Sequence, residues 1–446
     1  MREVAYDGLS VRKIYKNAQY TLSVFIINEN VYNDAEDRMS IKKFLKRLGP
    51  GFITGAADDD PSGIATYSQT GVQFGYGQLW TALFSFPFMV AVQEMCGRIG
   101  LVTGSGLSTI MRKHYPRPVL SVCVLLLVLA NTINIGADLG AMASAAQMLF
   151  HVPFVFWLFA LTLFTLGLEL FVPYPTYAKF LKYLTLSLFA YVGVAFLVKQ
   201  DWHLVLTSTF FPSFSFDRPF LLNIMAVLGT TISPYLFFWQ TDEEVEEAIA
   251  KGRSHSNRND VKAMRVDTML GMFFSNLVMF FIIMTAASVL RAQGITHIDT
   301  AAQAAEALRP LAGDFTFFLF ALGILGTGLL AVPILAGSAS YAVTEALGWK
   351  SGLSRTFKQA HGFYGIIAVA TLLGLLVNFF HVPSFQMLYY TAVFNGLSAP
   401  PLLLLILLIS NNKQVMGEQV NGRLSNILGV IIIAVMTGAG LAVLFF

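Results

Sequence analysis

The chain has 446 residues, of which 55% are hydrophobic and only 12% are charged. Soluble domains carry about 25% charged residues, so this composition excludes an ordinary water-soluble protein. The net charge of +3 is small, and no clustered basic face carries interleaved aromatic residues, so a nucleic-acid partner is not expected. A mean hydropathy of +0.63 instead favours an all-α protein that crosses a lipid bilayer many times.

The residues that usually carry catalysis or bind a resident cofactor form no recognisable pattern. Cys96 and Cys123 both lie inside apolar runs, and their spacing indicates neither a disulfide framework nor a metal site. No nucleophile–base constellation, phosphate-binding loop or zinc motif is present in the sequence. We therefore expect neither an enzyme nor a bound cofactor.

Residues 1–46 are mixed and charged, and we expect them to form a cytoplasmic extension. From residue 48 onwards, apolar segments recur that are long enough to span a bilayer, which takes about 20 helical residues. We expect eleven spans, at 48–74, 78–97, 118–149, 154–172, 180–198, 219–240, 265–290, 315–346, 362–380, 384–409 and 424–445.

The basic residues indicate the orientation of these spans. With the N-terminus inside, all but four of the 29 Lys and Arg residues fall on the cytoplasmic side. This asymmetry is typical of membrane proteins, whose cytoplasmic loops carry the excess of positive charge. We expect a monomer in the inner (plasma) membrane, and an odd number of spans places its C-terminus outside. The four exceptions are Lys199, Arg218, Arg291 and Arg309.

The first span is interrupted by charge. Asp58, Asp59 and Asp60 stand in its middle, and Pro61 follows directly. Each charge at the centre of a bilayer costs about 2.5–3.5 kcal/mol, and proline cannot continue a helix. We predict a half-helix, an unwound stretch and a second half-helix, with Asp60 as the N-cap and Pro61 at the first helical position.

The sixth span has the same design, because Ser233 and Pro234 interrupt it with a residue that can cap and one that can start a helix. Five spans separate the two breaks, so a repeated five-helix unit would have inverted topology. Interrupted segments at matching positions of two halves indicate a substrate site at the midplane of the membrane. The expected organisation is an extension (1–46), a first repeat (47–198), a second repeat (199–409) and a loop with span 11 (410–446).

The two breaks offer oxygen donors almost exclusively. Carboxylates, freed carbonyls and hydroxyls suit hard cations such as Mg²⁺, Ca²⁺ or Mn²⁺. Neither histidine nor cysteine stands at either break, which disfavours zinc or copper. The donors are the Asp60 carboxylate, the carbonyls of Ala57 and Thr230, and the hydroxyls of Ser62, Thr231 and Ser233.

Three patches resemble the NRAMP divalent-metal transporters. Gly49–Gly71 resembles the first span of that family, residues 97–104 resemble the loop after its second span, and Ala137-Asp138-Leu139 resembles its third-span acidic motif. The similarity covers residues 47–445. It implies a LeuT-like fold, in which ten core helices form two inverted repeats of five, an eleventh helix is added, and helices 1 and 6 are unwound at the midplane.

The departures from the family pattern affect which ion the site is expected to bind. Asp60 matches the metal-binding aspartate, but Gly63, Ser233 and Tyr235 stand where the family carries asparagine, methionine and histidine. Losing the amide and the thioether enlarges and hardens the site, which suits Mg²⁺ because this ion dehydrates reluctantly. The pattern is similar to the NRAMP-related magnesium transporters, which carry Mg²⁺ and Mn²⁺. The expected metal site consists of Asp60, Ala57, Gly63, Thr230 and Ser233.

Proton coupling in classical NRAMP proteins uses acids and histidines. Asp138 stands at the family's third-span aspartate, but Ala141 replaces the acid that follows and Tyr235 replaces the histidine. We therefore expect uncoupled transport, which a negative interior can drive at about 2.3 kcal/mol per charge per 100 mV. Residues expected to support the ligands or lie on a proton path are Asp59, Asp138, Tyr235, Asn395 and Ser398.

Two alternatives remain open, namely a proton-coupled Mn²⁺/Fe²⁺ transporter and an amino-acid transporter of the same fold. The aspartates count against the second alternative, because they would repel a substrate carboxylate. Outside the breaks, Glu94 and Arg98 are expected to form a structural i,i+4 pair, and Asn131, Asn134 and Asp138 to share one helix face. The acidic run 242–247 is expected to form a solvated cytoplasmic face.

Overall fold

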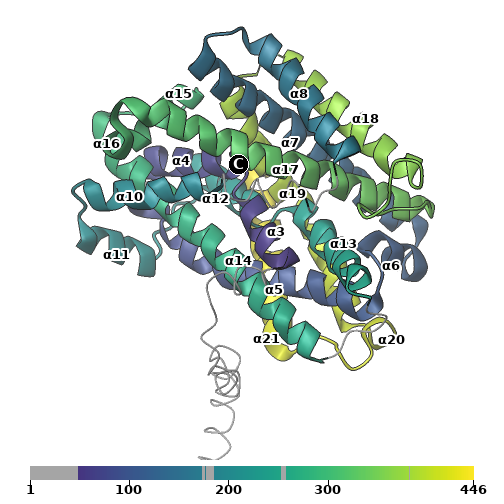
Figure 1. Cartoon of the computed structure of the whole chain (residues 1–446). Helices are drawn as coiled ribbons and strands as arrows, with labels where there is room; N and C mark the ends of the chain where they lie inside the picture. The colour runs from purple at the N-terminus through teal and green to yellow at the C-terminus, as the bar shows by residue number, and fades with distance from the viewer. Residues whose placement is uncertain (1–48, 173–175, 177–184, 253–257, 381, 446) are drawn as a thin grey trace, which may run out of the picture. The chain divides into compact units, whose positions relative to one another are not determined.

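A computed structural model describes residues 49–172, 176, 185–252, 258–380 and 382–445, and this part of the chain is almost entirely helical (Figure 1). The charged extension expected at 1–46 lies outside the described residues. Within the described residues, eight helical segments are long and apolar enough to cross a membrane, or nine if one bent pair counts as a single span, and one of the eight is Arg218–Ala250. An all-α, polytopic architecture is thereby confirmed.

The first expected span is broken where its aspartates stand. Helix α3 (Pro50–Asp58) ends there, and α4 (Pro61–Phe74) begins after Asp59 and Asp60 with a proline in its first turn. The Asp60 side chain caps α4 by accepting a hydrogen bond from the Gly63 amide, as predicted. Helix α5 (Trp80–Thr103) then leaves at 106° to the α4 segment.

The sixth expected span is broken in the same way, between α12 (Arg218–Thr231) and α13 (Pro234–Ala250). Ser233 is the residue before α13, but its hydroxyl makes no capping hydrogen bond to that helix. It donates instead to the carbonyls of Gly229 and Thr230 in the last turn of α12, at 2.8 Å each. The Ser233 hydroxyl therefore bonds to the end of the first half-helix and does not cap the second.

The remaining helices fall in the other expected spans and in the segments between them. The fifth expected span is described only from residue 185, where α10 is a short helix, so the count of eleven spans stays a prediction. The other helices are α6 (Leu107–His114), α7 (Arg117–Phe150), α8 (Phe154–Phe171), α10 (Ala190–Leu197), α11 (Trp202–Phe210), α14 (Arg258–Thr285), α15 (Ala301–Ala305), α16 (Arg309–Ala312), α17 (Thr316–Leu347), α18 (His361–Val377), α19 (Ser384–Asn411), α20 (Lys413–Met416) and α21 (Arg423–Phe445).

In each broken span, a glycine allows a half-helix to pack closely against a continuous helix. A Cβ atom at Gly55 of α3 would lie 2.3 Å from the backbone C and O of Gly271, so α3 packs directly on the backbone of α14. Figure 1 shows α3 beside α14. A Cβ atom at Gly229 of α12 would lie 1.9 Å from the carbonyl oxygen of Ala392 in α19. The half-helices are thus held by backbone contact, which fixes where their broken ends meet.

Large apolar side chains stay exposed on the outer helices. Leu125 on α7, Leu163 on α8 and Val430 on α21 expose 58%, 65% and 56% of their surface. In water such a surface would be an aggregation hazard, whereas lipid removes the penalty. Inside, Glu94 and Arg98 form the expected pair at 2.8 Å, and Arg265 of α14 joins the same carboxylate.

Candidate functional site

Asp60 lies where the two broken spans meet, and only 1% of its surface is exposed. Its Oδ1 atom accepts hydrogen bonds from the Gly63 amide at 2.8 Å and the Ser62 hydroxyl at 2.6 Å. Its Oδ2 atom accepts from Asn134 Nδ2 at 3.2 Å and lies 3.5 Å from the Tyr235 hydroxyl. One carboxylate oxygen therefore fixes the helix cap, and the other faces two donors that an ion could replace.

The other expected ligands surround this carboxylate. The carbonyl of Ala57, freed at the end of α3, accepts a hydrogen bond from the Tyr235 hydroxyl at 3.0 Å. The hydroxyls of Thr230 and Ser62 lie 3.1 Å apart and join the two breaks directly. All the expected ligands are buried. The structure thus brings α3, α4, α12 and α13 together through oxygen atoms.

Gly63 does not leave open space beside Asp60. A Cβ atom at this position would lie 3.2 Å from the Asp58 carbonyl oxygen and 3.2 Å from the ring of Tyr67. The Thr230 hydroxyl would be 3.5 Å away. The volume that the missing asparagine side chain would occupy is therefore filled in part by Tyr67, which the sequence analysis did not single out. The expected enlargement of the site stays a prediction.

The side chains of Asp58 and Asp59 contact Ser275 of α14. The Ser275 hydroxyl of α14 lies 2.6 Å from Asp58 Oδ2 and 3.3 Å from Asp59 Oδ1. Both side chains are buried, and Asp58 Oδ1 has no partner among the described residues. The three consecutive aspartates therefore divide their contacts, with Asp60 facing α13 and the other two facing α14.

Helix α7 contributes a residue to the site that the sequence analysis did not place there. Asn134 donates to Asp60, and Asn131 one turn earlier donates to the Leu335 carbonyl of α17 at 2.9 Å. Asp138, one turn later, is fully buried, and neither carboxylate oxygen has a hydrogen-bond partner among the described residues. The shared helix face was visible in the sequence, but which of the three residues meets Asp60 was not.

Asn395 and Ser398 lie buried in α19, and the Ser398 hydroxyl donates to the Asn395 carbonyl at 3.0 Å. The Asn395 amide nitrogen has no partner in the described part of the chain. Within that part, no hydrogen bond connects either residue to Asp60 or Tyr235. Their expected role in support of the ligands therefore stays a prediction.

On one side of Asp60, hydrogen bonds pin α3 to its neighbours. The Asp267 carboxylate of α14 accepts from the amides of Gly49 and Phe52, at 3.0 and 3.2 Å, and so satisfies the start of α3. The Thr54 hydroxyl bonds to the Gln240 side chain of α13. With the bond between Tyr235 and Ala57, these contacts close the structure on the side of the N-terminal half-helix.

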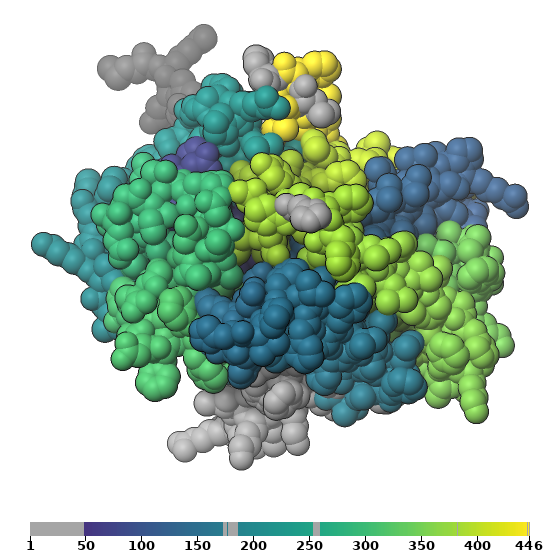
Figure 2. Space-filling view, turned by 90° about the horizontal axis from the view of Figure 1, so that it is seen from above, coloured from purple at the N-terminus to yellow at the C-terminus, as the bar shows by residue number. Residues whose placement is uncertain are grey.

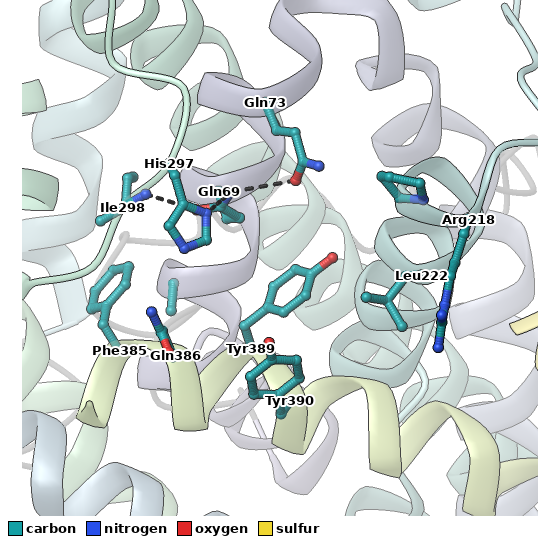
Figure 3. A pocket seen from close by; sticks show the side chains of 12 residues that line it. Gln69, Gln73, Arg218, Leu222, His297, Ile298, Phe385, Gln386, Tyr389 and Tyr390 are labelled. Carbon is teal, nitrogen blue, oxygen red and sulfur yellow. Dashed lines mark hydrogen bonds between the residues drawn. The ribbon is translucent and has the colours of Figure 1, made fainter. Parts of the chain in front are cut away.

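On the other side, a cavity of about 240 Å³ runs along α4. Ala65, Gln69 and Gln73 face it at intervals of one turn, and Gln69 contacts both Gln73, at 3.3 Å, and His297, at 3.0 Å (Figure 3). Ala65 follows Asp60 by five residues, which is about 7.5 Å along the helix. The rest of the wall includes Arg218, Leu222, Ile298, Phe385, Gln386, Tyr389 and Tyr390.

A second hollow, of about 600 Å³, lies where the end of α7 meets the segment around α15 and the start of α19. Figure 2 views this face, with the α7–α8 region in blue, the α15 region in green and α19 in yellow-green. Gln386 of α19 donates to Asp299, just before α15, at 2.9 Å. Both hollows therefore border the loop that precedes α15.

The donor set suits a transiently bound ion better than a permanently bound metal. Among the described residues, no group of three or more His, Cys, Asp or Glu side chains is placed to hold a metal. The site has one carboxylate beside carbonyl and hydroxyl oxygens, a set that hard cations accept. A single formal charge permits release more readily than a cage of several carboxylates does.

Comparisons with known proteins indicate the family of the chain. Residues 51–446 match the family model described as "Natural resistance-associated macrophage protein-like" (Nramp). The "Divalent metal cation transporter MntH" of Caldanaerobacter subterraneus is 24% identical over 404 residues, covering 88% of this chain and 91% of that protein. The protein of the same description from Chromohalobacter salexigens is 26% identical over 411 residues, covering 89% and 90%.

Solved structures show the same fold. A manganese transporter from Eremococcus coleocola superposes with a TM-score of 0.74 at 17% identity, covering 90% of this chain and 86% of that one. Mhp1, a nucleobase-cation-symport-1 family transporter, reaches 0.59 at 13% identity, with 89% and 90% covered. At these identities the likeness concerns the fold alone, and it confirms the LeuT-like architecture with two broken helices.

Proposed function

We propose that this chain, which belongs to the Nramp family, is a secondary transporter of divalent metal ions and carries Mg²⁺ and Mn²⁺. The observation that carries the proposal is the buried Asp60 carboxylate between two helix breaks, which the Tyr235 hydroxyl links to the Ala57 carbonyl and the Ser62 hydroxyl links to the Thr230 hydroxyl. An ion replaces the donors on Asp60 Oδ2 and takes its other ligands from Ala57, Gly63, Thr230 and Ser233 or from retained water.

The proposed preference for Mg²⁺ rests on the absence of a thioether and an imidazole from the second break. Ser233 offers a hydroxyl bonded to the end of α12, and Tyr235 offers a hydroxyl in place of an imidazole. Hard oxygen donors favour Mg²⁺ and Mn²⁺ over softer ions such as Fe²⁺. Mg²⁺ usually keeps several waters and uses only one or two carboxylates, so a single aspartate is sufficient.

Uncoupled transport rests on the gaps between titratable groups. From α7 it is Asn134 that bonds to Asp60, and an amide cannot carry a proton as a carboxyl or imidazole does. Within the described residues, no hydrogen bond joins Asp138 to Asp60. A divalent ion moving to a negative interior gains about 2.3 kcal/mol per charge per 100 mV, which is enough for uptake without protons. The buried and unpartnered Asp138 carboxylate favours the second candidate, a proton-coupled Mn²⁺/Fe²⁺ transporter.

The structure fits one end of an alternating-access cycle. With the N-terminus cytoplasmic, the cavity along α4 opens to the outside, and the bonds of α3 to α13 and α14 close the cytoplasmic side. The ion then reaches a midplane site past Gln69 and leaves when α3 separates from Asp267 and Gln240. We propose the two inverted repeats (47–198 and 199–409), an outside C-terminus, the inner (plasma) membrane and a monomeric unit as parts of the same account.

The test is ion flux into liposomes that contain the purified full-length chain. An internal Mg²⁺ indicator and a pH dye are followed for wild type, Asp60→Ala and the control Asp314→Asn, which removes an acid far from the site. We expect voltage-driven Mg²⁺ uptake that Asp60→Ala abolishes, that the control retains and that moves no protons. Mn²⁺ uptake with protons and without Mg²⁺ uptake would establish the second candidate and overturn the first.

A further inference from the structure

Two residues of the acidic run that follows the second break do not lie on the solvated face that its charge predicts. Asp242 and Glu244 of α13 expose only 3% and 2% of their surface. Glu244 accepts a hydrogen bond from Gln240 Nε2 at 2.9 Å, whereas Asp242 Oδ2 is buried and has no partner among the described residues. Burial of a carboxylate oxygen without a partner is costly, and the side chain of Asp242 is in hydrogen-bonding contact with another acid, Glu345 of α17.

Asp242 faces a second carboxylate across the backbone of Gly106, the residue before α6. A Cβ atom at Gly106 would lie 2.0 Å from Asp242 Oδ1 and 2.1 Å from Glu345 Oε1. The two oxygens therefore lie in each other's immediate neighbourhood, on the same side of Gly106. Glu345, at the end of α17, also accepts a hydrogen bond from the Thr109 amide in the first turn of α6, at 3.0 Å. Three elements thus meet at two convergent carboxylates.

No base neutralises this pair directly. Within the described residues, neither Asp242 nor Glu345 forms an ion pair with a lysine or arginine. Arg112 of α6 acts on Glu345 only from a distance, whereas Glu243 and Glu246 add further negative charge near Asp242. Two buried carboxylates this close repel each other strongly unless a cation or a proton lies between them.

We propose that Asp242 and Glu345 bind a divalent cation at a second site, distinct from the transport site. Mg²⁺ is commonly held by one or two carboxylates and several waters, which is what this pair offers. Asp242 follows Tyr235 by seven residues, about 10 Å along α13 towards its cytoplasmic end. The bound ion ties α13 and α17 to the start of α6, on the side where α3 is closed. The proposal does not depend on which ion is transported.

Mn²⁺ binding to the purified full-length chain, measured by electron paramagnetic resonance, tests this site. The Asp60→Ala variant removes the transport site, and we expect it still to bind one Mn²⁺, which Mg²⁺ displaces. Adding Asp242→Asn or Glu345→Gln should weaken this binding at least tenfold, whereas Glu243→Gln, the matched neutralisation one residue away, should change it less than twofold.

Gly106→Ala provides a test that removes no charge. The added methyl group takes the place where both carboxylate oxygens converge, so it should weaken binding of the second Mn²⁺ at least tenfold, as Asp242→Asn does. Elution as a single species on gel filtration checks that each variant is folded. An Asp60→Ala variant that binds no Mn²⁺ would overturn the proposal and show that the pair shares a proton. Loss of flux with the second Mn²⁺ retained would instead count only against the proposed transport function.

Discussion

The contact between α3 and α14 gives the sharpest prediction about gating. Gly55 packs against the backbone of Gly271, and a Cβ atom at Gly55 would lie 2.3 Å from the Gly271 carbonyl carbon and oxygen. Backbone in the middle of α14 cannot retreat, so Gly55→Ala must push α3 outwards. Because α3 forms part of the proposed cytoplasmic closure, this substitution should favour the state in which that side is open.

The expected size follows from the cost of overpacking, which is typically about 1–3 kcal/mol. That cost falls on the closed arrangement and is relieved when α3 moves away. Since about 1.4 kcal/mol is a factor of ten in an equilibrium, the ratio of open to closed molecules should rise by a factor between about 5 and about 140. The effect is one of conformational population and requires no change at Asp60.

Cysteine labelling reads out this population. Gln240 is fully buried between α13 and α3, so a Gln240→Cys reporter should react with a maleimide only when α3 has moved. The native cysteines Cys96 and Cys123 are buried and give a low background. Gly167→Ala on α8, where a Cβ atom meets nothing within 4 Å, is the matched control. An unchanged labelling rate in Gly55→Ala, or an equal rise in Gly167→Ala, would refute the reasoning.

Four further predictions concern the candidate site and one buried ion pair outside it. Tyr235→Phe removes the hydroxyl that competes with the ion for Ala57 and Asp60, so the KM for Mg²⁺ flux should fall about two- to tenfold, as expected for a bond of about 0.5–1.5 kcal/mol. Ser233→Met adds a soft thioether, so Mn²⁺ should compete better against Mg²⁺ in mixed-ion flux; an unchanged ratio would place the ion elsewhere. Asp138→Asn should leave Mg²⁺ flux within about twofold, whereas a collapse of transport would indicate proton coupling. Arg98→Leu should lower the free energy of unfolding, by less than the roughly 3–5 kcal/mol of a buried charge left without any partner, because Arg265 still pairs with the buried Glu94 carboxylate. A shift no larger than that of the exposed Lys251→Ala control would contradict this.

The two helix breaks could be predicted because their causes are local. Aspartates in an apolar span and prolines that follow a capping residue act within a few positions of the chain. The pair of Glu94 and Arg98 was predictable for the same reason, since residues four apart meet on a helix. These features fixed the fold class and placed Asp60 at the centre of the site.

The remaining contacts depend on which helices come together, and no local pattern determines that. Asn134 reaches Asp60 from α7, and Ser275 reaches Asp58 from α14. The contact of Tyr67 with Gly63 is different in kind, because the two residues lie four apart on α4 and their contact is local. The burial of Asp242 requires Gly106 and Glu345, which are distant in sequence. A charged run therefore predicted a solvated face where the fold instead makes an enclosed pair.

The central claim is that the ion binds between the two helix breaks on Asp60. Anomalous diffraction from crystals grown with Mn²⁺, with Asp60→Ala crystals as the control, tests it most directly. The account predicts a peak in coordination contact with Asp60 Oδ2 and the Ala57 carbonyl, with the Tyr235 hydroxyl displaced from that carbonyl, and no such peak in the variant. A peak that persists in Asp60→Ala, or that lies away from both breaks, would contradict the account.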